Sequence, residues 1–295
     1  MARSLKKYCG SVNSMGVTAI IVAHNPNEGR FRVVLGSAAS QVNNVVVVDN
    51  ASINREFIEG SCNGFRNCWF IEVGFNSGVA HAINIGVDYA MRWLSQEWFL
   101  LLDDDTVLLK GAVEKALNAY QSLPSALRGR VGIISLGAVN GDCKVKAVRF
   151  EPTSGSLVRA GIFRLARFRD DFFLDQSDFD FYARVRRLGY LTLRLDCKLI
   201  DHELGRERWI PIISSILGRA IDYEPPWRYY YIVRNSTILL REGLIDPATY
   251  IHQLANWGAR ILLADGLTKL LKPLVLGLTH GLMHEIGFLD KRYIG

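Results

Sequence analysis

Runs of consecutive apolar residues, each ending in polar residues, are the clearest pattern in the chain. Such runs have the length of a strand and no polar side, which is typical of strands covered on both faces by helices. They occur at 17–23, 45–48, 98–102 and 131–136, with two further strand candidates at 69–73 and 191–195. Apolar residues at helical spacing are found between them, at 30–40, 79–94, 110–122 and 179–188. This alternation predicts an α/β fold whose mostly parallel sheet delivers polar groups to one common edge.

Three consecutive aspartates, Asp103, Asp104 and Asp105, follow the apolar run at 98–102. Side chains alternate along an extended backbone, so we expect Asp103 and Asp105 on one side and Asp104 on the other. Two crowded carboxylates favour a hard divalent cation such as Mg²⁺ or Mn²⁺, with phosphate oxygens completing its coordination. The alternative is a solvated turn that caps the next helix, which is common for one aspartate and less expected for three.

A loop at 74–78 leads into the helix predicted at 79–94. We expect Asn76 or Ser77 to cap this helix, and Gly78 to keep its first turn slim enough for a phosphate to approach the N-terminus. An ordinary capped helix is the alternative. The phosphate interpretation gains weight because the strand that carries the aspartates comes next in the chain.

A second group of acids, Asp175, Asp178 and Asp180, lies at the start of the helix predicted at 179–188. One of these carboxylates could act as a general base toward an attacking hydroxyl. The alternative is capping, because negative charge is favoured at a helix N-terminus, and sequence position alone leaves the two about even. His202 follows the strand candidate at 191–195 and is either a third ligand to a divalent ion or a structural histidine.

Composition indicates a folded protein with an anionic partner. Of 295 residues, 49% are hydrophobic, and the net charge of +6 fits a nucleoside diphosphate, a nucleic acid or an acidic membrane face. No RNA-binding or zinc pattern is present, so we expect no nucleic acid partner. Cysteines at 9, 62, 68, 143 and 197 are odd in number and scattered, which predicts free thiols in a reducing compartment.

The two ends of the chain differ from its centre. Residues 1–15 are basic but lack the apolar stretch of a signal peptide, and Met15 is an alternative start. The segment 261–289 is strongly apolar, but charged residues interrupt it before it reaches the length of a spanning helix. A helix at 260–272 would be basic and amphipathic. Packing on the core, packing in a homo-oligomer and contact with a membrane surface all remain open for it.

As an ordered set, these segments resemble the family 2 glycosyltransferases of GT-A fold, and within them the rhamnosyltransferase and galactofuranosyltransferase-like branch. The resemblance covers residues 15–241 and rests on VTAIIVAHNP, VVVVDNAS, VGFNSGVAHAINIGV, FLLLDDDT, FFLDQSDFDFYARVRRLGY, HELG and WRYYYIVRN. It implies a Rossmann-like sheet flanked by helices, with a C-terminal helical extension. The implied parts are an N-terminal extension (1–15), a nucleotide-sugar-binding half (16–109), an acceptor-binding and catalytic half (110–205) and a helical C-terminal region (206–295).

The resemblance also implies roles for individual residues. The donor would be held by His24, Asn25, Asp49, Asn50, Asn76, Gly78, Asp103 and Asp104. A divalent ion would be held by Asp103, Asp105 and His202. Asp178 matches the catalytic base, and the residues that support it or contact the acceptor would be Asp175, Asp180 and Arg184. One departure is His24, which stands where this branch usually has tyrosine, so the usual aromatic packing against the nucleobase is in doubt.

The implied activity is a metal-dependent, inverting transfer of a sugar to a hydroxyl of a glycan or lipid-linked acceptor, in cell-surface polysaccharide synthesis. Deoxythymidine diphosphate rhamnose (dTDP-rhamnose) is the favoured donor, with UDP-galactofuranose or another nucleotide hexose behind it. The expected location is cytoplasmic, with peripheral contact to the inner face of the cell membrane left open. Arginines at 159, 164, 167 and 169 either contact an acceptor phosphate or form a solvated basic face, and the second interpretation is favoured.

Two rival functions remain at this point. A nucleotidyltransferase shares an acidic metal site, but it needs a glycine-rich basic loop after the first strand, and HNPNEGR is a poor version of one. A non-catalytic nucleotide-sugar-binding module would need no general base.

Overall fold

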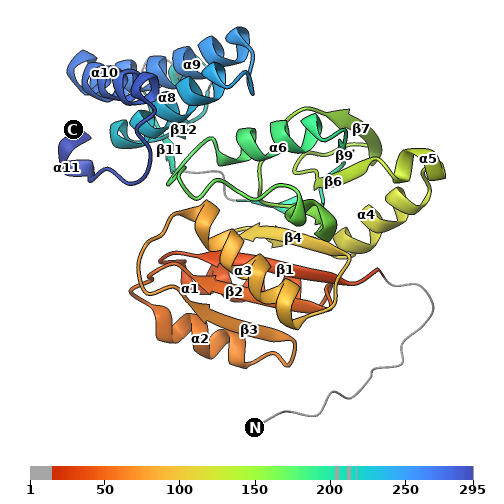
Figure 1. Ribbon diagram of the computed structural model, residues 1–295. Coiled ribbons are helices and arrows are strands. Elements are labelled where there is room, and N and C mark those ends of the chain that lie inside the picture. Colours follow the sequence, from red (N-terminus) through yellow and green to blue (C-terminus); the bar gives the residue numbers. More distant parts are fainter. Residues whose placement is uncertain (1–14, 203–205, 211–213, 217, 295) are drawn as a thin grey trace.

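A sheet of eight strands forms the centre of the computed structural model, which describes residues 15–202, 206–210, 214–216 and 218–294 (Figure 1). Its strands are β1 (Val17–Ala23), β2 (Asn44–Asp49), β3 (Cys68–Glu72), β4 (Trp98–Asp103), β6 (Val131–Leu136), β7 (Lys144–Val148), β8 (Ser156–Arg159) and β9 (Leu191–Asp196). Their order is β3-β2-β1-β4-β8-β6-β9-β7. The pairs β1–β2, β2–β3, β1–β4 and β6–β9 are parallel, whereas β4–β8, β6–β8 and β7–β9 are antiparallel. The predicted mostly parallel sheet is therefore confirmed.

Helices cover both faces of this sheet. One face packs against α1 (Glu28–Ala39), α2 (Arg55–Asn63) and α4 (Ala112–Gln121), and the other against α3 (Val79–Trp93), α6 (Ser177–Arg187) and the 3-10 helix η1 (Ala160–Arg164). A short helix, α5 (Ser125–Arg128), precedes β6. In β1, Ala19 and Ile21 belong to the first core, and Ile20 and Val22 to the second. Burial on both sides explains why the strand sequences are apolar without interruption.

The parallel strands end beside one another, which brings the polar segments of the sequence together. In the register of the sheet, Val22 of β1 lies opposite Asp103 of β4, and Ala23 lies opposite Asp49 of β2. The residues that follow these strands therefore meet at one edge, where ligands bind in open α/β sheets.

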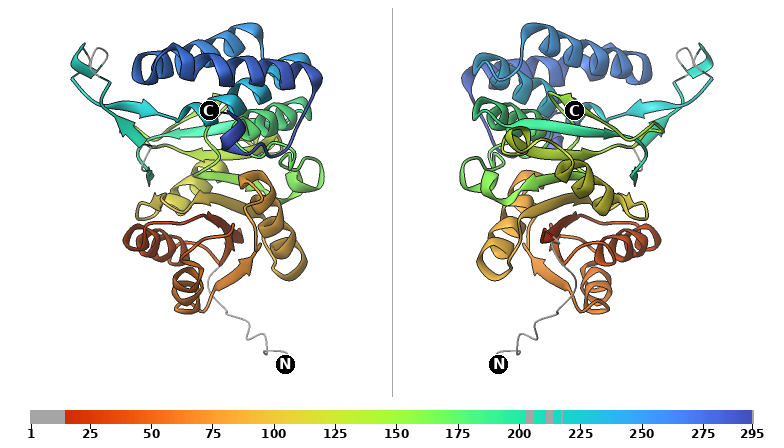
Figure 2. Two further views of the ribbon diagram at one scale, coloured as in Figure 1. Left: turned by 90° about the vertical axis from the view of Figure 1, so that its left-hand side faces the viewer. Right: turned by 90° about the vertical axis from the view of Figure 1, so that its right-hand side faces the viewer.

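The C-terminal region forms a separate stack of helices on the side of the sheet away from β3 (Figures 1 and 2). These helices are α8 (Pro226–Arg241), α9 (Pro247–Asp265), α10 (Leu267–Met283) and α11 (Lys291–Ile294). Four short strands lie outside the main sheet and form two small sheets: β5 (Val107–Leu108) pairs with β10 (Ile200–Asp201), and β11 (Arg206–Arg208) pairs with β12 (Ile221–Tyr223). The prediction of one helix over 260–272 is wrong, because Gly266, with φ of +86°, separates α9 from α10. No helix of the described residues is long and apolar enough to cross a membrane.

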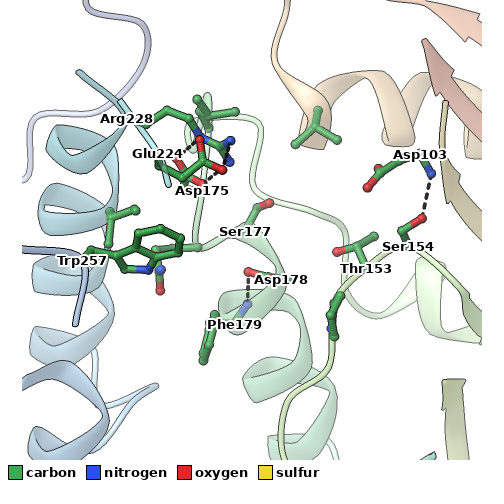
Figure 3. Close-up of a pocket in the computed structure, with 15 residues that line it drawn as sticks. Asp103, Thr153, Ser154, Asp175, Ser177, Asp178, Phe179, Glu224, Arg228 and Trp257 are labelled. Carbon is green, nitrogen blue, oxygen red and sulfur yellow. Dashed lines mark hydrogen bonds and ion pairs between the residues drawn. The ribbon is translucent and has the colours of Figure 1, made fainter. Parts of the chain in front are cut away.

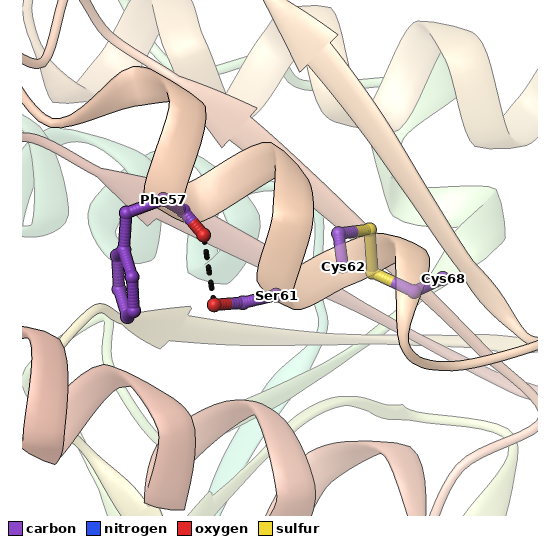
Figure 4. The surroundings of a disulfide bond; sticks show 4 residues. All are labelled: Phe57, Ser61, Cys62 and Cys68. Atoms are coloured by element: carbon purple, nitrogen blue, oxygen red, sulfur yellow. Dashed lines mark hydrogen bonds between the residues drawn. A yellow bond between two sulfur atoms is a disulfide. The ribbon is translucent and has the colours of Figure 1, made fainter.

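The prediction of free thiols is also wrong for four cysteines. Cys62 at the end of α2 and Cys68 at the start of β3 form one disulfide (Figure 4). Cys143 and Cys197 form the second, because β7 and β9 pair antiparallel and bring residues 54 positions apart to a Cα separation of 4.5 Å. Cys9 lies outside the described residues. Neither pair could be predicted from the sequence, because the spacing of these cysteines matches no recognisable motif.

Candidate active site

Asp103, Asp105 and His202 form a compact group at the end of β4. His202 Nε2 lies 3.5 Å from Asp105 Oδ1 and 4.0 Å from Asp103 Oδ2. Among the described residues, these three offer ligand atoms that all lie within 4.8 Å of one another. Two carboxylates and one imidazole form a donor set that suits Mg²⁺ or Mn²⁺.

A small sheet brings His202 to the aspartates from about a hundred residues further along the chain. Strand β10 pairs antiparallel with β5, which directly follows the acidic turn, so Asp201 lies opposite Val107. Arg30 connects the acidic turn to β10, because its guanidinium donates hydrogen bonds to the backbone carbonyl oxygens of Asp105 and Asp201. The group is thus held by backbone pairing and by a partly buried cation rather than by local sequence.

The three aspartates divide as predicted, although Asp104 and Asp105 lie in a turn after β4 and not in an extended strand. Asp104 points away from His202, and its Oδ2 accepts a hydrogen bond of 2.8 Å from the backbone N–H of His24. Burial raises the pKa of Asp103 to about 6, although His202 opposes the rise, and burial raises the pKa of Asp104 to about 7. Desolvated carboxylates of this kind favour a neighbouring positive charge.

The side chains expected at the donor meet where β1 and β2 end. His24 Nδ1 lies 2.7 Å from the carbonyl oxygen of Asn50, and Asn50 Nδ2 donates to Asn76 Oδ1 over 3.2 Å. Asn25 Oδ1 accepts from the backbone N–H of Ile53 over 2.7 Å. Asp49 differs from these, because it is 1% exposed and accepts from the backbone N–H of Ser52. Its position supports the loop after β2.

The helix cap that we expected at Asn76 or Ser77 is wrong. Gly78 is the N-cap residue of α3, so no side chain of the N-cap residue accepts a hydrogen bond from the first turn of the helix. Asn76 Oδ1 instead accepts from the backbone N–H of Gly78, and Asn50 Oδ1 accepts from that of Ser77. The loop is therefore organised by Asn50 across the sheet edge, and not by a local capping motif.

Gly78 is required by close packing. Its φ is +83°, and a Cβ at this position would lie 2.3 Å from the carbonyl oxygen of Phe173. Gly74 has the same φ of +83° but has nothing within 4 Å of a built Cβ. Substitution at Gly74 would therefore introduce backbone strain alone, whereas substitution at Gly78 would introduce both backbone strain and steric overlap.

We expect Gly78→Ala to lower the free energy of unfolding by about 2–4 kcal/mol, because strain and overpacking add. Gly74→Ala is the matched control, and its cost should be the strain alone, about 1–2 kcal/mol. Urea titration followed by circular dichroism measures both. Equal losses in the two variants would contradict the account of close packing at Gly78.

Asp178 faces a cavity of about 420 Å³ that also contains Asp103 (Figure 3). Asp178 lies in the first turn of α6, and its Oδ1 accepts a hydrogen bond of 2.8 Å from the backbone N–H of Phe179. Thr153 and Ser154 lie between it and Asp103 (Figure 3). Burial raises the pKa of Asp178 to about 6, with the nearby Asp175 and Asp103 adding to the rise. The carboxylate is therefore more basic than an exposed aspartate, yet mostly ionised at neutral pH.

The residues expected to support Asp178 act at two different places. Asp180 is fully buried and binds Arg184 one turn later in α6, so this pair stabilises the helix. Asp175 lines the cavity and binds Arg228 of α8 through two hydrogen bonds of 2.6 and 3.1 Å. Asp175 thereby links the segment before α6 to the C-terminal helices.

The arginines at 159, 164, 167 and 169 do not line this cavity. Arg167 pairs with Asp88 at 2.7 Å, and Arg169 binds both Asp171 and Glu242 at 2.8 Å. These contacts favour the interpretation as a basic and structural face.

Residues 18–137, from β1 through β6, match the family model for glycosyl transferase family 2. The dTDP-rhamnosyl transferase RfbF of Shigella flexneri is 25% identical in an alignment 259 residues long that covers 80% of this chain and 84% of that protein. The chain is a glycosyltransferase, and its sequence is similar to family 2.

Solved structures agree with this fold. TarS of S. aureus, residues 1–349 in complex with UDP-GlcNAc, aligns with a TM-score of 0.59 at 15% identity, covering 91% of this chain and 81% of that one. The mannosyltransferase PcManGT of Pyrobaculum calidifontis, in complex with GDP-Man and Mn²⁺, aligns with a TM-score of 0.55 at 16% identity, covering 95% and 78%. At these identities the likeness establishes the fold of the glycosyltransferase, which is GT-A as predicted.

Several residues that line the cavity of this glycosyltransferase were not predicted as site residues, including four with large polar or aromatic side chains. Gln176 precedes α6, whereas Glu224, Arg228 and Trp257 come from the C-terminal region. The segment WRYYYIVRN contains Arg228 and contributed to the resemblance, but nothing in its spacing indicated a role in the site.

Proposed function

We propose that this glycosyltransferase moves a sugar from a nucleoside diphosphate donor to an acceptor hydroxyl by one direct displacement. The observation that carries the proposal is that Asp103, of the candidate metal group, and Asp178, the candidate base, line the same cavity. A donor at the metal group and an acceptor at Asp178 would then meet between them.

In the proposed step, Asp178 takes the proton of the acceptor hydroxyl while the hydroxyl oxygen attacks the anomeric carbon. A new carbon–oxygen bond forms on one face of the sugar. The bond to the phosphate oxygen breaks on the opposite face, and its electron pair leaves with the nucleoside diphosphate. The anomeric configuration is inverted, and the proton passes from Asp178 to solvent. The raised pKa of Asp178, about 6, suits a base that works near neutral pH.

Asp103, Asp105 and His202 are the residues that would hold Mg²⁺ or Mn²⁺. Such an ion, when bound, offsets the negative charge that develops on a leaving diphosphate. Asp104 has a separate task, because its hydrogen bond to the backbone of His24 fixes the end of β1 against β4. His24, Asn25, Asn50 and Asn76 would then receive the nucleoside, with Gly78 near the diphosphate.

The favoured donor is dTDP-rhamnose. Its support is the similarity to a protein described as a dTDP-rhamnosyl transferase, at 25% identity. No feature of the described residues favours UDP-galactofuranose over it.

A donor panel tests this function. Thermal stabilisation and slow donor hydrolysis are measured with dTDP-rhamnose, UDP-galactofuranose, UDP-GlcNAc and GDP-mannose, each with Mg²⁺ and with Mn²⁺. We expect dTDP-rhamnose to give the largest response. A larger response to another donor would replace rhamnose as the transferred sugar, and no response to any donor would contradict the proposed function.

We also propose that the acceptor is a glycan or a lipid-linked glycan, and that α10 contacts an anionic membrane surface. Leu267, Leu271 and Val275 form an exposed apolar stripe along α10, spaced by four residues. Lys269 and Lys272 on the same helix are also exposed. Apolar area combined with positive charge suits anionic lipid.

We expect Lys269→Glu combined with Lys272→Glu to reduce co-sedimentation with vesicles of one-third phosphatidylglycerol in phosphatidylcholine. Each lysine near an anionic surface contributes about 1 kcal/mol, so charge reversal of two should lower binding more than tenfold. Lys110→Glu combined with Lys115→Glu, two exposed lysines outside the C-terminal helices, is the matched control. Equal sedimentation of both double variants would contradict membrane contact through α10.

A further inference from the structure

The cavity at Asp178 has two walls from different parts of the chain. Asp103, Ser154 and Thr153 lie on the side of the sheet, and Arg228, Glu224 and Trp257 lie on the side of the C-terminal helices (Figure 3). Asp178 and Ser177 lie between the two walls (Figure 3). The space that extends from Asp178 toward α8 and α9 is therefore the part of the cavity farthest from the candidate metal group.

The charges of this far part are acidic. Of the described residues that line the cavity, Arg228 alone carries a positive charge. Its guanidinium is already bound by two carboxylates, Asp175 at 2.6 Å and Glu224 at 2.7 Å. Asp178 adds a third carboxylate to the same space. An anionic ligand group would thus meet three carboxylates and a cation that is already neutralised, which disfavours its binding.

The remaining lining groups suit a polyhydroxylated ligand. Carboxylate oxygens accept hydrogen bonds from hydroxyl groups, and the side chain of Ser177, which lies between the two walls, adds a hydroxyl. Gln176 also lines the cavity; it is 7% exposed, and its Oε1 has no hydrogen-bond partner among the described residues. An unsatisfied buried amide oxygen is costly unless a ligand or water donates to it.

Trp257 provides the apolar surface that such a ligand also needs. It is half-buried in α9, and the guanidinium of Arg260 lies over its ring, 4.7 Å from the centroid, so the indole is held in place. Sites for small polar ligands typically combine an aromatic surface with a few convergent polar groups. The cavity contains both.

We propose that this space is a subsite for an uncharged sugar unit of the acceptor, with Trp257 as its apolar platform and the carboxylates of Asp175, Asp178 and Glu224 as acceptors for its hydroxyls. The proposal rests on the proposed function and adds the chemical class of the unit that receives the transferred sugar. It excludes a uronic acid, or a phosphate carried directly on that unit, from the reacting position. A lipid diphosphate would have to lie outside the cavity, beyond this first unit.

The platform is tested with the full chain, the donor selected by the donor panel, and neutral methyl glycosides as acceptors. We expect Trp257→Ala to raise the acceptor KM about tenfold or more, with a much smaller change in donor KM, because an aromatic contact to the acceptor is lost. Trp257→Phe should restore most of the loss. Trp93→Ala is the matched control, since Trp93 on α3 is 64% exposed and lies outside the cavity. A donor KM that rises as much as the acceptor KM would contradict the acceptor role.

The charge selectivity is tested with pairs of acceptors that differ only in one carboxylate, such as methyl glucoside and methyl glucuronide, and the galactose pair. We expect kcat/KM to be at least about 100-fold lower for the uronides, since like charges meet in a desolvated space. Glu224→Gln should reduce the difference in kcat/KM between the neutral glycosides and the uronides, because one carboxylate is removed while Asp175 still binds Arg228. Uronides that react as well as their neutral partners would overturn the proposal.

The two proposals fail in different ways. Donor hydrolysis without transfer to any neutral glycoside would overturn the subsite but leave the donor function in place. Absence of donor hydrolysis in the unmodified protein would instead contradict the proposed function on which the subsite depends.

Discussion

Asp178→Asn is expected to lower kcat for sugar transfer by about 10²- to 10⁴-fold, the usual contribution of a positioned general base. Asparagine keeps the size of the side chain and an oxygen that can accept from the backbone N–H of Phe179, but it cannot take up a proton. The donor KM should change little. Release of nucleoside diphosphate in the presence of acceptor measures both quantities.

The pH profile provides a second readout of the same residue. Burial, assisted by Asp175 and Asp103, raises the pKa of Asp178 to about 6, so the basic form is lost as the pH falls through that value. We expect kcat/KM of the unmodified protein to fall tenfold per unit below about pH 6. The residual activity of Asp178→Asn should not show this fall in kcat/KM below about pH 6.

Asp88→Asn is the control, because Asp88 is 66% exposed and pairs with Arg167 away from the cavity. It should retain the rate and the pH profile of the unmodified protein. Normal transfer by Asp178→Asn would contradict the assignment of the base.

Asp105→Ala and His202→Ala are each expected to abolish metal-dependent stabilisation by the donor. Loss of an outer contact to a metal ligand typically costs about 10- to 100-fold, and loss of a ligand itself should exceed this. Chelation with EDTA should reduce the unmodified protein to the same level, and excess Mn²⁺ should restore it but not the variants. Thermal shift with donor, with and without the ion, measures the effect separately from turnover.

His81→Ala is the matched control for the histidine. His81 on α3 pairs with Asp170 at 3.1 Å and does not belong to the metal group. Its removal should leave the response to the ion unchanged. If His202→Ala also keeps the full response, His202 is not a ligand.

Much of this arrangement could be predicted from short-range patterns. Apolar runs indicate strands because the sheet is covered on both faces. Asp104 is separated from Asp103 and Asp105 as predicted, but Asp104 and Asp105 lie in a turn after β4 and not in an extended strand. The order of strands and helices then placed the polar segments at a common edge.

Long-range packing could not be predicted in this way. Asp175 binds Arg228, 53 positions later, and Trp257 reaches the cavity only because α9 packs against α8. The disulfide between Cys143 and Cys197 depends on the pairing of β7 with β9, and no short-range pattern in the sequence predicts that pairing. The break at Gly266 was hidden because apolar residues continue at helical spacing on both sides of it.

The anomeric configuration of the product tests the central claim most directly. Proton NMR is recorded during transfer from a donor of defined configuration, before the product can equilibrate. A single displacement assisted by Asp178 predicts a product of inverted configuration, with one nucleoside diphosphate released per sugar transferred. A product that retains the donor's configuration would contradict the account.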